Sequence, residues 1–305
     1  MICSTFPPDL VYISSIRILE WSQSVRPVVS GLVAAALVSL TGCAISVPEN
    51  TFLYPDTRIA AENIDLKPGP ALPESAQAQT LAYAGGQLSA TRLSSDQGSQ
   101  APLILFCGGN MFRQSAYGGQ TSDKLLPFGD VLLFDYPGYG ASTGVSDVAS
   151  MKAAAGAMAA HARAAANQEQ RRLILWGHSL GGPVCAEAAT QAKADILVLE
   201  TTTPSARAML KEALGWKRFL IHVRLAPRLA EIDIPSTLAD YPGQVIVLEA
   251  RRDTVLPPVL SRRLAQALTA EGVSVDHLVF AEAGHNDVHS QPDFTSRMAE
   301  ALARP

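Results

Sequence analysis

The chain has 305 residues, a formal net charge of −4 and 48% hydrophobic residues. A chain of this length and composition can bury one large core, and α/β folds of this size commonly form a single domain. Nucleic-acid binding requires clustered Lys and Arg residues, which the acidic balance does not favour. The four cysteines form no C-x-x-C pair, so no structural zinc site is expected.

An apolar run near the N-terminus has the features of an export signal. Residues 28–40 are almost entirely apolar, and Arg17 and Arg26 precede them. The run is shorter than the ~20 residues that a membrane-spanning helix needs, and a short run with a positive flank is typical of a signal peptide.

The residues that follow this run, Leu-Thr-Gly-Cys at 40–43, resemble the lipobox of bacterial lipoproteins. The resemblance implies that residues 1–42 are a signal peptide and that Cys43 carries a lipid. It also implies a protein of the bacterial cell envelope, anchored to a membrane on the periplasmic side or at the outer membrane. The alternative is an ordinary signal peptide or an uncleaved anchor with an incidental cysteine.

Residues 43–75 are rich in Pro and Asp and show no sustained hydrophobic period, so we expect a tether that wraps onto the domain. The remainder, 76–305, alternates short apolar runs with longer helical stretches. Eight strands are expected, at 80–83, 88–93, 102–107, 131–136, 173–177, 196–200, 245–250 and 277–283. Gly85 and Gly86 predict a hairpin between the first two. Continuous apolar runs among the later strands predict a mostly parallel sheet covered by helices on both faces.

Helices are expected at 147–167, 183–193, 258–270 and 292–303, and Asp147 is a suitable N-cap for the first of these. The segment 204–242 lies between the sixth and seventh expected strands. We interpret this segment as a small helical cap over the active site, although its length also suits an ordinary crossover connection.

Residues 177–181, Gly-His-Ser-Leu-Gly, form a G-x-S-x-G motif between an expected strand and an expected helix. In this context the motif predicts a sharp turn that holds Ser179 exposed at the head of the helix, where small neighbours avoid a clash. The helix N-terminus favours negative charge beside the serine. We therefore predict that Ser179 is a catalytic nucleophile.

A serine nucleophile needs a general base and an acid that orients the base. Asp253 follows the strand at 245–250, and His285 follows the strand at 277–283, so both strand exits supply the required residue type. Asp253 and His285 are the predicted acid and base. Glu200 is the main rival as the acid, since some triads take it from the earlier strand.

Two further histidines compete with His285. His178 neighbours the nucleophile, but the turn is expected to aim its side chain elsewhere. His289 lies four residues beyond His285 and raises a two-histidine metal site, which lacks an intervening Glu and an evident third ligand. We predict no metal and no organic cofactor, and we expect Asp287 to stabilise the loop of His285.

An oxyanion hole requires backbone N–H groups beside the nucleophile. We expect these donors to be the N–H of Leu180 and an N–H of the loop after the strand 102–107, at Gly109 or Asn110, where glycine permits close approach. Cys107 and Cys185 are interpreted as buried thiols in preference to a disulfide.

Four motifs together closely resemble those of an α/β-hydrolase subgroup. They are Cys-Gly-Gly-Asn at 107–110, Asp-Tyr-Pro-Gly-Tyr-Gly at 135–140, the G-x-S-x-G turn at 177–181, here called the elbow, and Ala-Gly-His-Asn-Asp at 283–287. This subgroup includes membrane-associated acyl esterases and depalmitoylating thioesterases. The resemblance implies an α/β-hydrolase domain over 76–305 and a serine hydrolase that acts on small-molecule or lipid-derived acyl esters or thioesters, including palmitate esters. A serine peptidase of the same fold and a non-catalytic envelope lipoprotein are the alternatives.

Overall fold

The computed structural model describes residues 44–219 and 222–304. The predicted signal peptide at 1–42 and the predicted lipidation site at Cys43 lie outside these residues. No helix in the described part of the chain is long and apolar enough to cross a membrane.

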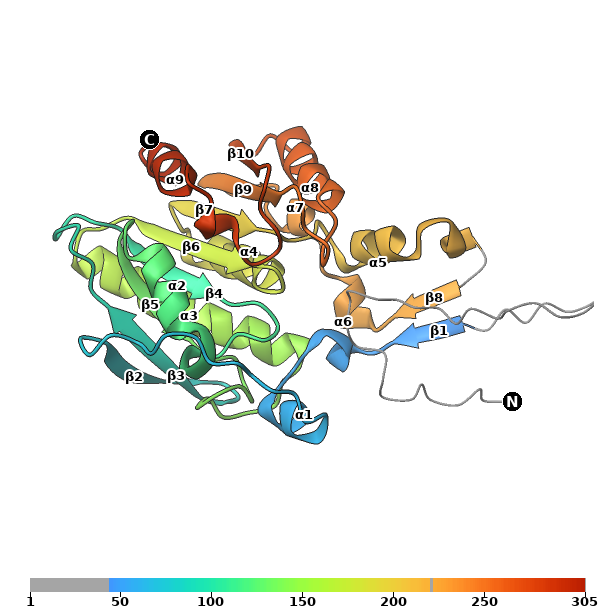
Figure 1. Ribbon diagram of the computed structural model, residues 1–305, viewed down its shortest axis with the longest axis horizontal. Coiled ribbons are helices and arrows are strands. Elements are labelled where there is room, and N and C mark those ends of the chain that lie inside the picture. The colour runs from blue at the N-terminus through green and yellow to red at the C-terminus, as the bar shows by residue number, and fades with distance from the viewer. Residues whose placement is uncertain (1–43, 220–221, 305) are drawn as a thin grey trace, which may run out of the picture.

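An eight-stranded sheet forms the centre of the molecule (Figure 1). Its spatial order is β10-β9-β7-β6-β4-β5-β3-β2. The strands β4, β5, β6, β7, β9 and β10 are mutually parallel, whereas β3 is antiparallel to β2 and to β5. Their bounds are β2 Gln77–Tyr83, β3 Gly86–Leu93, β4 Leu103–Cys107, β5 Asp130–Phe134, β6 Leu173–His178, β7 Ile196–Glu200, β9 Gln244–Ala250 and β10 Val275–Phe280.

The strand sequences explain why the sheet is buried on both faces. All five residues of β4 are buried. Leu103, Leu105 and Cys107 contribute to one hydrophobic cluster and Ile104 and Phe106 to the other, because successive side chains of a strand point to opposite faces. A continuous apolar run is therefore the pattern that a strand between two helical layers requires.

Helices cover both faces of the sheet. Residues of α3, α4 and α8 belong to one hydrophobic cluster, and residues of α2 and α9 belong to the other. Their bounds are α2 Gln114–Leu125, α3 Val148–Gln168, α4 Gly181–Ala192, α8 Val259–Ala270 and α9 Phe294–Leu302. Helix α3 begins as expected, because the Asp147 carboxylate accepts a hydrogen bond of 2.7 Å from the Ser150 N–H.

The N-terminal segment lies against the domain after its first strand. It contains β1 Ala44–Val47, the 3-10 helix η1 Glu49–Phe52 and α1 Asp56–Ala61. Leu53 and Tyr54 are buried, and the Tyr54 N–H donates to the Tyr139 hydroxyl at 2.6 Å. The residues after β1 are therefore part of the packed structure.

The segment after β7 contains α5 Ala206–Leu214, η2 Gly215–Phe219, β8 His222–Leu225, α6 Pro227–Ala230 and α7 Ile234–Thr237. Strand β8 pairs in parallel with β1 and forms a separate two-stranded sheet. The expected cap is therefore not purely helical. A strand forms here because β1, from the far N-terminus, supplies the partner.

The α/β-hydrolase fold is confirmed, with its mostly parallel sheet and two helical layers. The hairpin at Gly85 and Gly86 is also confirmed, with Tyr83 paired to Gly86. Several elements were not predicted, among them α2 and β1. Helix α2 contains Gly118 and Gly119 and several polar residues, and β1 has only four residues, so neither shows a clear hydrophobic period.

Candidate active site

Ser179 occupies a sharp turn between β6 and α4. Its φ of 54° is in the left-handed region, which is unusual for a residue with a side chain. The turn requires glycines around it: a Cβ on Gly181 would lie 2.0 Å from the Cys107 carbonyl oxygen, and one on Gly182 would lie 2.3 Å from the Thr202 hydroxyl. The Ser179 N–H donates to the Glu200 carbonyl at 2.9 Å, which joins the turn to β7.

The structure brings Ser179, His285 and Asp253 together at the carboxyl edge of the sheet. His285 Nε2 lies 3.0 Å from Ser179 Oγ, and His285 Nδ1 lies 2.7 Å from Asp253 Oδ2. The His285 and Asp253 side chains are 9% and 2% exposed. This is the hydrogen-bond chain that a serine nucleophile, a general base and an orienting acid require.

Asp253 is fixed by its own loop. Its Oδ1 atom accepts hydrogen bonds from the N–H groups of Val255 and Leu256, each at 2.8 Å. The other carboxylate oxygen is the one that faces His285. Backbone donors therefore orient the carboxylate independently of the imidazole.

The loop of His285 is held from several sides. Its carbonyl oxygen lies 3.1 Å from His178 Nε2 and accepts a hydrogen bond of 3.2 Å from the Thr201 hydroxyl. The Gly284 N–H donates to the Asp287 carboxylate, in the stabilising position expected for Asp287. His178 thus contacts the backbone of the proposed base and makes no hydrogen bond to the Ser179 hydroxyl. Burial lowers the His178 pKa to about 4, so this imidazole is neutral near pH 7.

Glu200 lies one strand away from Asp253 and has different partners. Its carboxylate forms an ion pair with Lys124 and accepts a hydrogen bond of 2.6 Å from the Trp176 indole N–H. Although burial alone would raise the Glu200 pKa, Lys124 and these hydrogen bonds hold it below its usual range. Glu200 makes no hydrogen bond to His285 among the described residues, so the geometry favours Asp253 as the acid.

The expected oxyanion loop lies beside Ser179. A Cβ on Gly109 would be 3.6 Å from Ser179 Cβ and 3.1 Å from His178 Nδ1, so glycine lets the backbone approach this closely without a tight contact. Within the described residues, the N–H groups of Gly109, Asn110 and Leu180 donate no hydrogen bond. These groups are therefore available to a substrate oxygen.

One unpredicted side chain fastens this loop to the N-terminal segment. Arg113 is 2% exposed. It forms a 2.6 Å ion pair with Asp56, a hydrogen bond to the Tyr54 carbonyl and a 3.1 Å hydrogen bond to the Met111 carbonyl. Arginine is rarely buried this fully, so the sequence offered no local signal for this role.

The interpretation of Cys107 and Cys185 as thiols is wrong. The two residues form a disulfide, with their Cα atoms 5.9 Å apart. Cys107 ends β4 and Cys185 lies in the second turn of α4, so residues 78 positions apart meet where the helix packs against the strand end. The bond joins the strand before the oxyanion loop to the helix after the nucleophile.

His289 does not complete a metal site. Among residues 44–219 and 222–304, no three His, Cys, Asp or Glu side chains gather as metal ligands would. His289 lies in the 3-10 helix η3 Val288–Ser290, and burial lowers its pKa. The two-histidine hypothesis thus gains no third ligand here.

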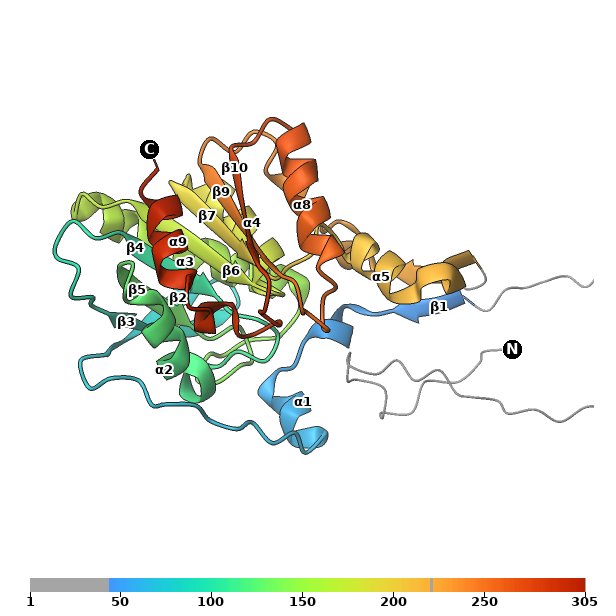
Figure 2. The same ribbon diagram turned by 45° about the horizontal axis from the view of Figure 1, so that its top comes forward.

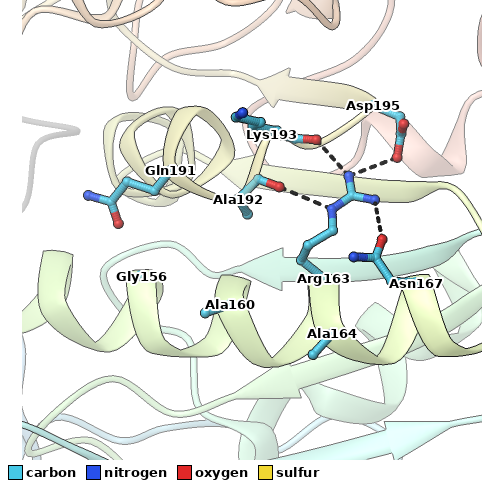
Figure 3. Close-up of a pocket in the computed structure, with 9 residues that line it drawn as sticks. All are labelled: Gly156, Ala160, Arg163, Ala164, Asn167, Gln191, Ala192, Lys193 and Asp195. Atoms are coloured by element: carbon cyan, nitrogen blue, oxygen red, sulfur yellow. Dashed lines mark hydrogen bonds and ion pairs between the residues drawn. The ribbon is translucent and has the colours of Figure 1, made fainter.

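A surface hollow of about 700 Å³ lies away from these residues, between α3 and the C-terminal end of α4 (Figure 3). Arg163 lies in it and donates to the Ala192 and Lys193 carbonyls and to Asp195. Because these carbonyls belong to the end of α4, Arg163 has a structural role: it satisfies acceptors at the C-terminus of that helix. The hollow is lined by no serine, cysteine or histidine of the described residues and is a poor candidate for catalysis.

Comparison with known proteins agrees with the fold. Residues 104–225 match the model of the alpha/beta hydrolase family. An esterase of Pyrococcus furiosus superposes with a TM-score of 0.58 at 15% identity, covering 77% of this chain and 98% of that one. The esterase Est2 of Thermogutta terrifontis superposes with a TM-score of 0.56 at 16% identity, covering 75% and 93%.

Two curated relatives from different strains of Mycobacterium tuberculosis are described only as uncharacterized. Each is 28% identical over 195 residues, which is 62% of this chain. The chain spans 65% of the length of these relatives. The fold of the chain is thus that of the α/β hydrolases, and the match to the family model is confined to residues 104–225.

Proposed function

We propose that this protein is a serine hydrolase that cleaves carboxylic ester or thioester bonds through an acyl-enzyme intermediate. The observation that carries the proposal is the continuous hydrogen-bond chain from Ser179 Oγ through His285 to Asp253. The elbow conformation of Ser179 and the free N–H groups around it support the same chemistry. The structural neighbours named above are esterases, which is consistent with this reaction class.

In the proposed reaction, His285 Nε2 takes the proton of Ser179 Oγ as the oxygen attacks the acyl carbonyl. The N–H groups of Leu180 and of Gly109 or Asn110 stabilise the negative carbonyl oxygen. The protonated His285 then donates its proton to the leaving alcohol or thiol. His285 next deprotonates water, which attacks the acyl enzyme, and the proton returns to Ser179 as the carboxylic acid leaves. Asp253 orients the imidazole and stabilises its charge throughout.

A fluorophosphonate probe tests the nucleophile. We expect the intact protein to be labelled at Ser179 and the Ser179→Ala variant to remain unlabelled. The same variant should lose ester hydrolysis by about 10⁴-fold or more, because triad members act as a unit. Persistent labelling of the variant would move the nucleophile elsewhere, and an unlabelled intact protein would favour a non-catalytic role.

The substrate class requires a separate panel. Acyl esters of graded chain length, a palmitoyl thioester and a peptide amide should be compared as substrates. We expect hydrolysis of esters or thioesters to exceed that of the amide. A preference for the amide would support the serine peptidase alternative.

We also propose that the chain is exported and anchored in a bacterial envelope membrane through a lipid on Cys43. The apolar run at 28–40 and the lipobox-like residues at 40–43 support this. Globomycin should cause the uncleaved precursor to accumulate, and Cys43→Ser should abolish the incorporation of labelled palmitate into the protein. Palmitate incorporation into the Cys43→Ser variant would contradict lipidation at this residue.

A further inference from the structure

A part of the molecule extends beyond the hydrolase body and carries its most exposed aromatic residues. We define the arm as the described elements β1, α5, η2 and β8. Figures 1 and 2 show the arm extending away from the sheet in both views. It leaves the body after β7, at the carboxyl edge that also holds Ser179.

The arm is fixed at its base and lightly packed elsewhere. A small hydrophobic cluster of Val148, Ala206 and Leu229 joins its base to the body. Beyond this cluster, Ala206 is the one buried residue of α5, and the two strands β1 and β8 pair with no further strand of the described chain. A two-stranded sheet is marginally stable in water by itself, so the arm leaves apolar and backbone groups for a further contact.

Apolar side chains at the end of the arm are exposed to an unusual degree. Trp216 is 67% exposed and Phe219 is 77% exposed. Both lie in η2, between the exposed cations Lys211 and Arg224 of the flanking elements. Tryptophan and phenylalanine beside basic residues are characteristic of segments that lie in the membrane interface.

The charge of the arm is opposite to that of the whole protein. Residues 206–225 contain five Arg or Lys residues and one Glu, whereas the chain has a formal net charge of −4. The one Glu, Glu212, pairs with Arg263 of the body at 2.8 Å. Within the described residues none of the five cations has an ion-pair partner, and Arg218 instead stacks on the Phe219 ring at 4.5 Å. These cations complement an anionic surface.

The pairing of β1 with β8 places this region beside Ala44, the residue that follows the proposed lipidation site. Ala44, the residue after Cys43, pairs with His222, and Phe219 precedes His222 by three residues. Three residues span at most about 10 Å, so the exposed aromatic group and the start of β1 belong to the same end of the ribbon. The chain before β1 contains the apolar run 28–40.

We infer that the arm is a membrane-contacting surface that inserts Trp216 and Phe219 among lipid headgroups and binds anionic lipid phosphates through its basic residues. This inference rests on the proposed anchoring at Cys43 and adds a second point of contact to it. A lipid on Cys43 holds the protein at one point of the chain, and a basic and aromatic patch supplies additional attraction and a second point of contact. The arm would hold the carboxyl edge of the sheet at a fixed height above the bilayer.

The fluorescence of Trp216 tests the inference in the lipid-anchored protein isolated from membranes. The sequence has three tryptophans, Trp21, Trp176 and Trp216, and Trp176 is fully buried. Trp21 lies in the proposed signal peptide, and a Trp21→Phe background removes its signal from any precursor that remains, so Trp216 is the responsive fluorophore. The protein is reconstituted in vesicles of phosphatidylcholine, with or without phosphatidylglycerol, in which a fraction of the lipid chains is brominated.

We expect brominated lipid to quench Trp216, and to quench it more strongly in vesicles that contain phosphatidylglycerol. The double variant Lys217→Gln/Arg218→Gln should lose this difference, as should added salt, because the attraction is screened. The matched control Lys193→Gln, at the C-cap of α4 on the opposite edge of the sheet, should keep it.

Two results would overturn the inference. Trp216 could remain unquenched by lipid and fully accessible to acrylamide in the vesicles. It could instead be shielded from acrylamide without lipid quenching, which would identify a protein partner or a second copy as the occupant. Hydrolysis of a water-soluble short-chain ester by the same samples is read separately, so failure of the arm proposal and failure of the hydrolase proposal are distinguishable.

Discussion

Two buried carboxylates occupy equivalent places at the ends of neighbouring strands, yet their surroundings differ. Asp253 follows β9 and faces the imidazole of His285, with its second oxygen held by two backbone N–H groups. Glu200 ends β7 and faces Lys124 and the Trp176 indole. The first arrangement is linked to a group that can exchange a proton with Ser179, whereas the second is a closed ion pair.

The difference shows that position along the chain does not by itself identify a catalytic acid. Both residues fit the strand-end pattern, and the partner decides between them. Lys124, which pairs with Glu200, comes from α2, the helix that the sequence did not predict. Because the hydrophobic pattern of α2 is weak, the sequence does not predict that Lys124 lies on a helix beside Glu200.

The largest expected effect separates the two carboxylates by activity. Asp253→Asn should reduce kcat for ester hydrolysis by about 10⁴-fold, because the amide favours the wrong imidazole tautomer. Its fold should be intact by circular dichroism. Near-full activity of this variant would reverse the comparison.

Glu200→Gln is the matched control for that experiment. It should retain most of the hydrolytic activity but lose about 3 kcal/mol of unfolding free energy in urea, because Lys124 is left buried without its carboxylate. The double variant Lys124→Met/Glu200→Gln should recover part of that loss. Strong inactivation by Glu200→Gln in a folded protein would make Glu200 a candidate acid again.

A further prediction concerns the disulfide, which joins the end of β4 to α4 beside the nucleophile turn. The variant Cys107→Ala/Cys185→Ala should lose about 4 kcal/mol of unfolding free energy, because the closed loop is long. Dithiothreitol should destabilise the wild-type protein to a similar extent and leave the variant unchanged. Sensitivity of the variant to dithiothreitol would show that another bond is responsible.

The smallest effect concerns His178, whose Nε2 atom contacts the His285 carbonyl oxygen. Its pKa of about 4 lies below the ordinary value of 6.5, so the unfolded chain binds a proton that the folded chain rejects. The free energy of unfolding should therefore fall as the pH drops from 6.5 towards 4. Its slope against pH should approach the value for one additional proton bound by the unfolded chain. His178→Gln retains a donor for the His285 carbonyl and should show a shallower decline in urea unfolding between pH 7 and pH 5. Equal slopes would contradict this.

The central sheet and the candidate triad could be predicted because their signals are local. Apolar runs mark the parallel strands, glycines mark the turn around Ser179, and Asp253 and His285 stand at strand exits. The remaining features depend on contacts between distant residues. Arg113 receives its partners from residues 54 and 56, β8 becomes a strand through pairing with β1, and Cys107 meets Cys185 through helix packing. No short window of sequence contains these pairs.

The disulfide also changes what a proteolytic cut would do. The bond closes a loop that includes β5, α3, β6 and the nucleophile turn. Within this loop, residues 143–145 are exposed, and Val145 is 70% exposed, so this surface segment is accessible to a protease. A nick there would leave both fragments covalently joined, with the oxyanion loop and Ser179 still part of one molecule.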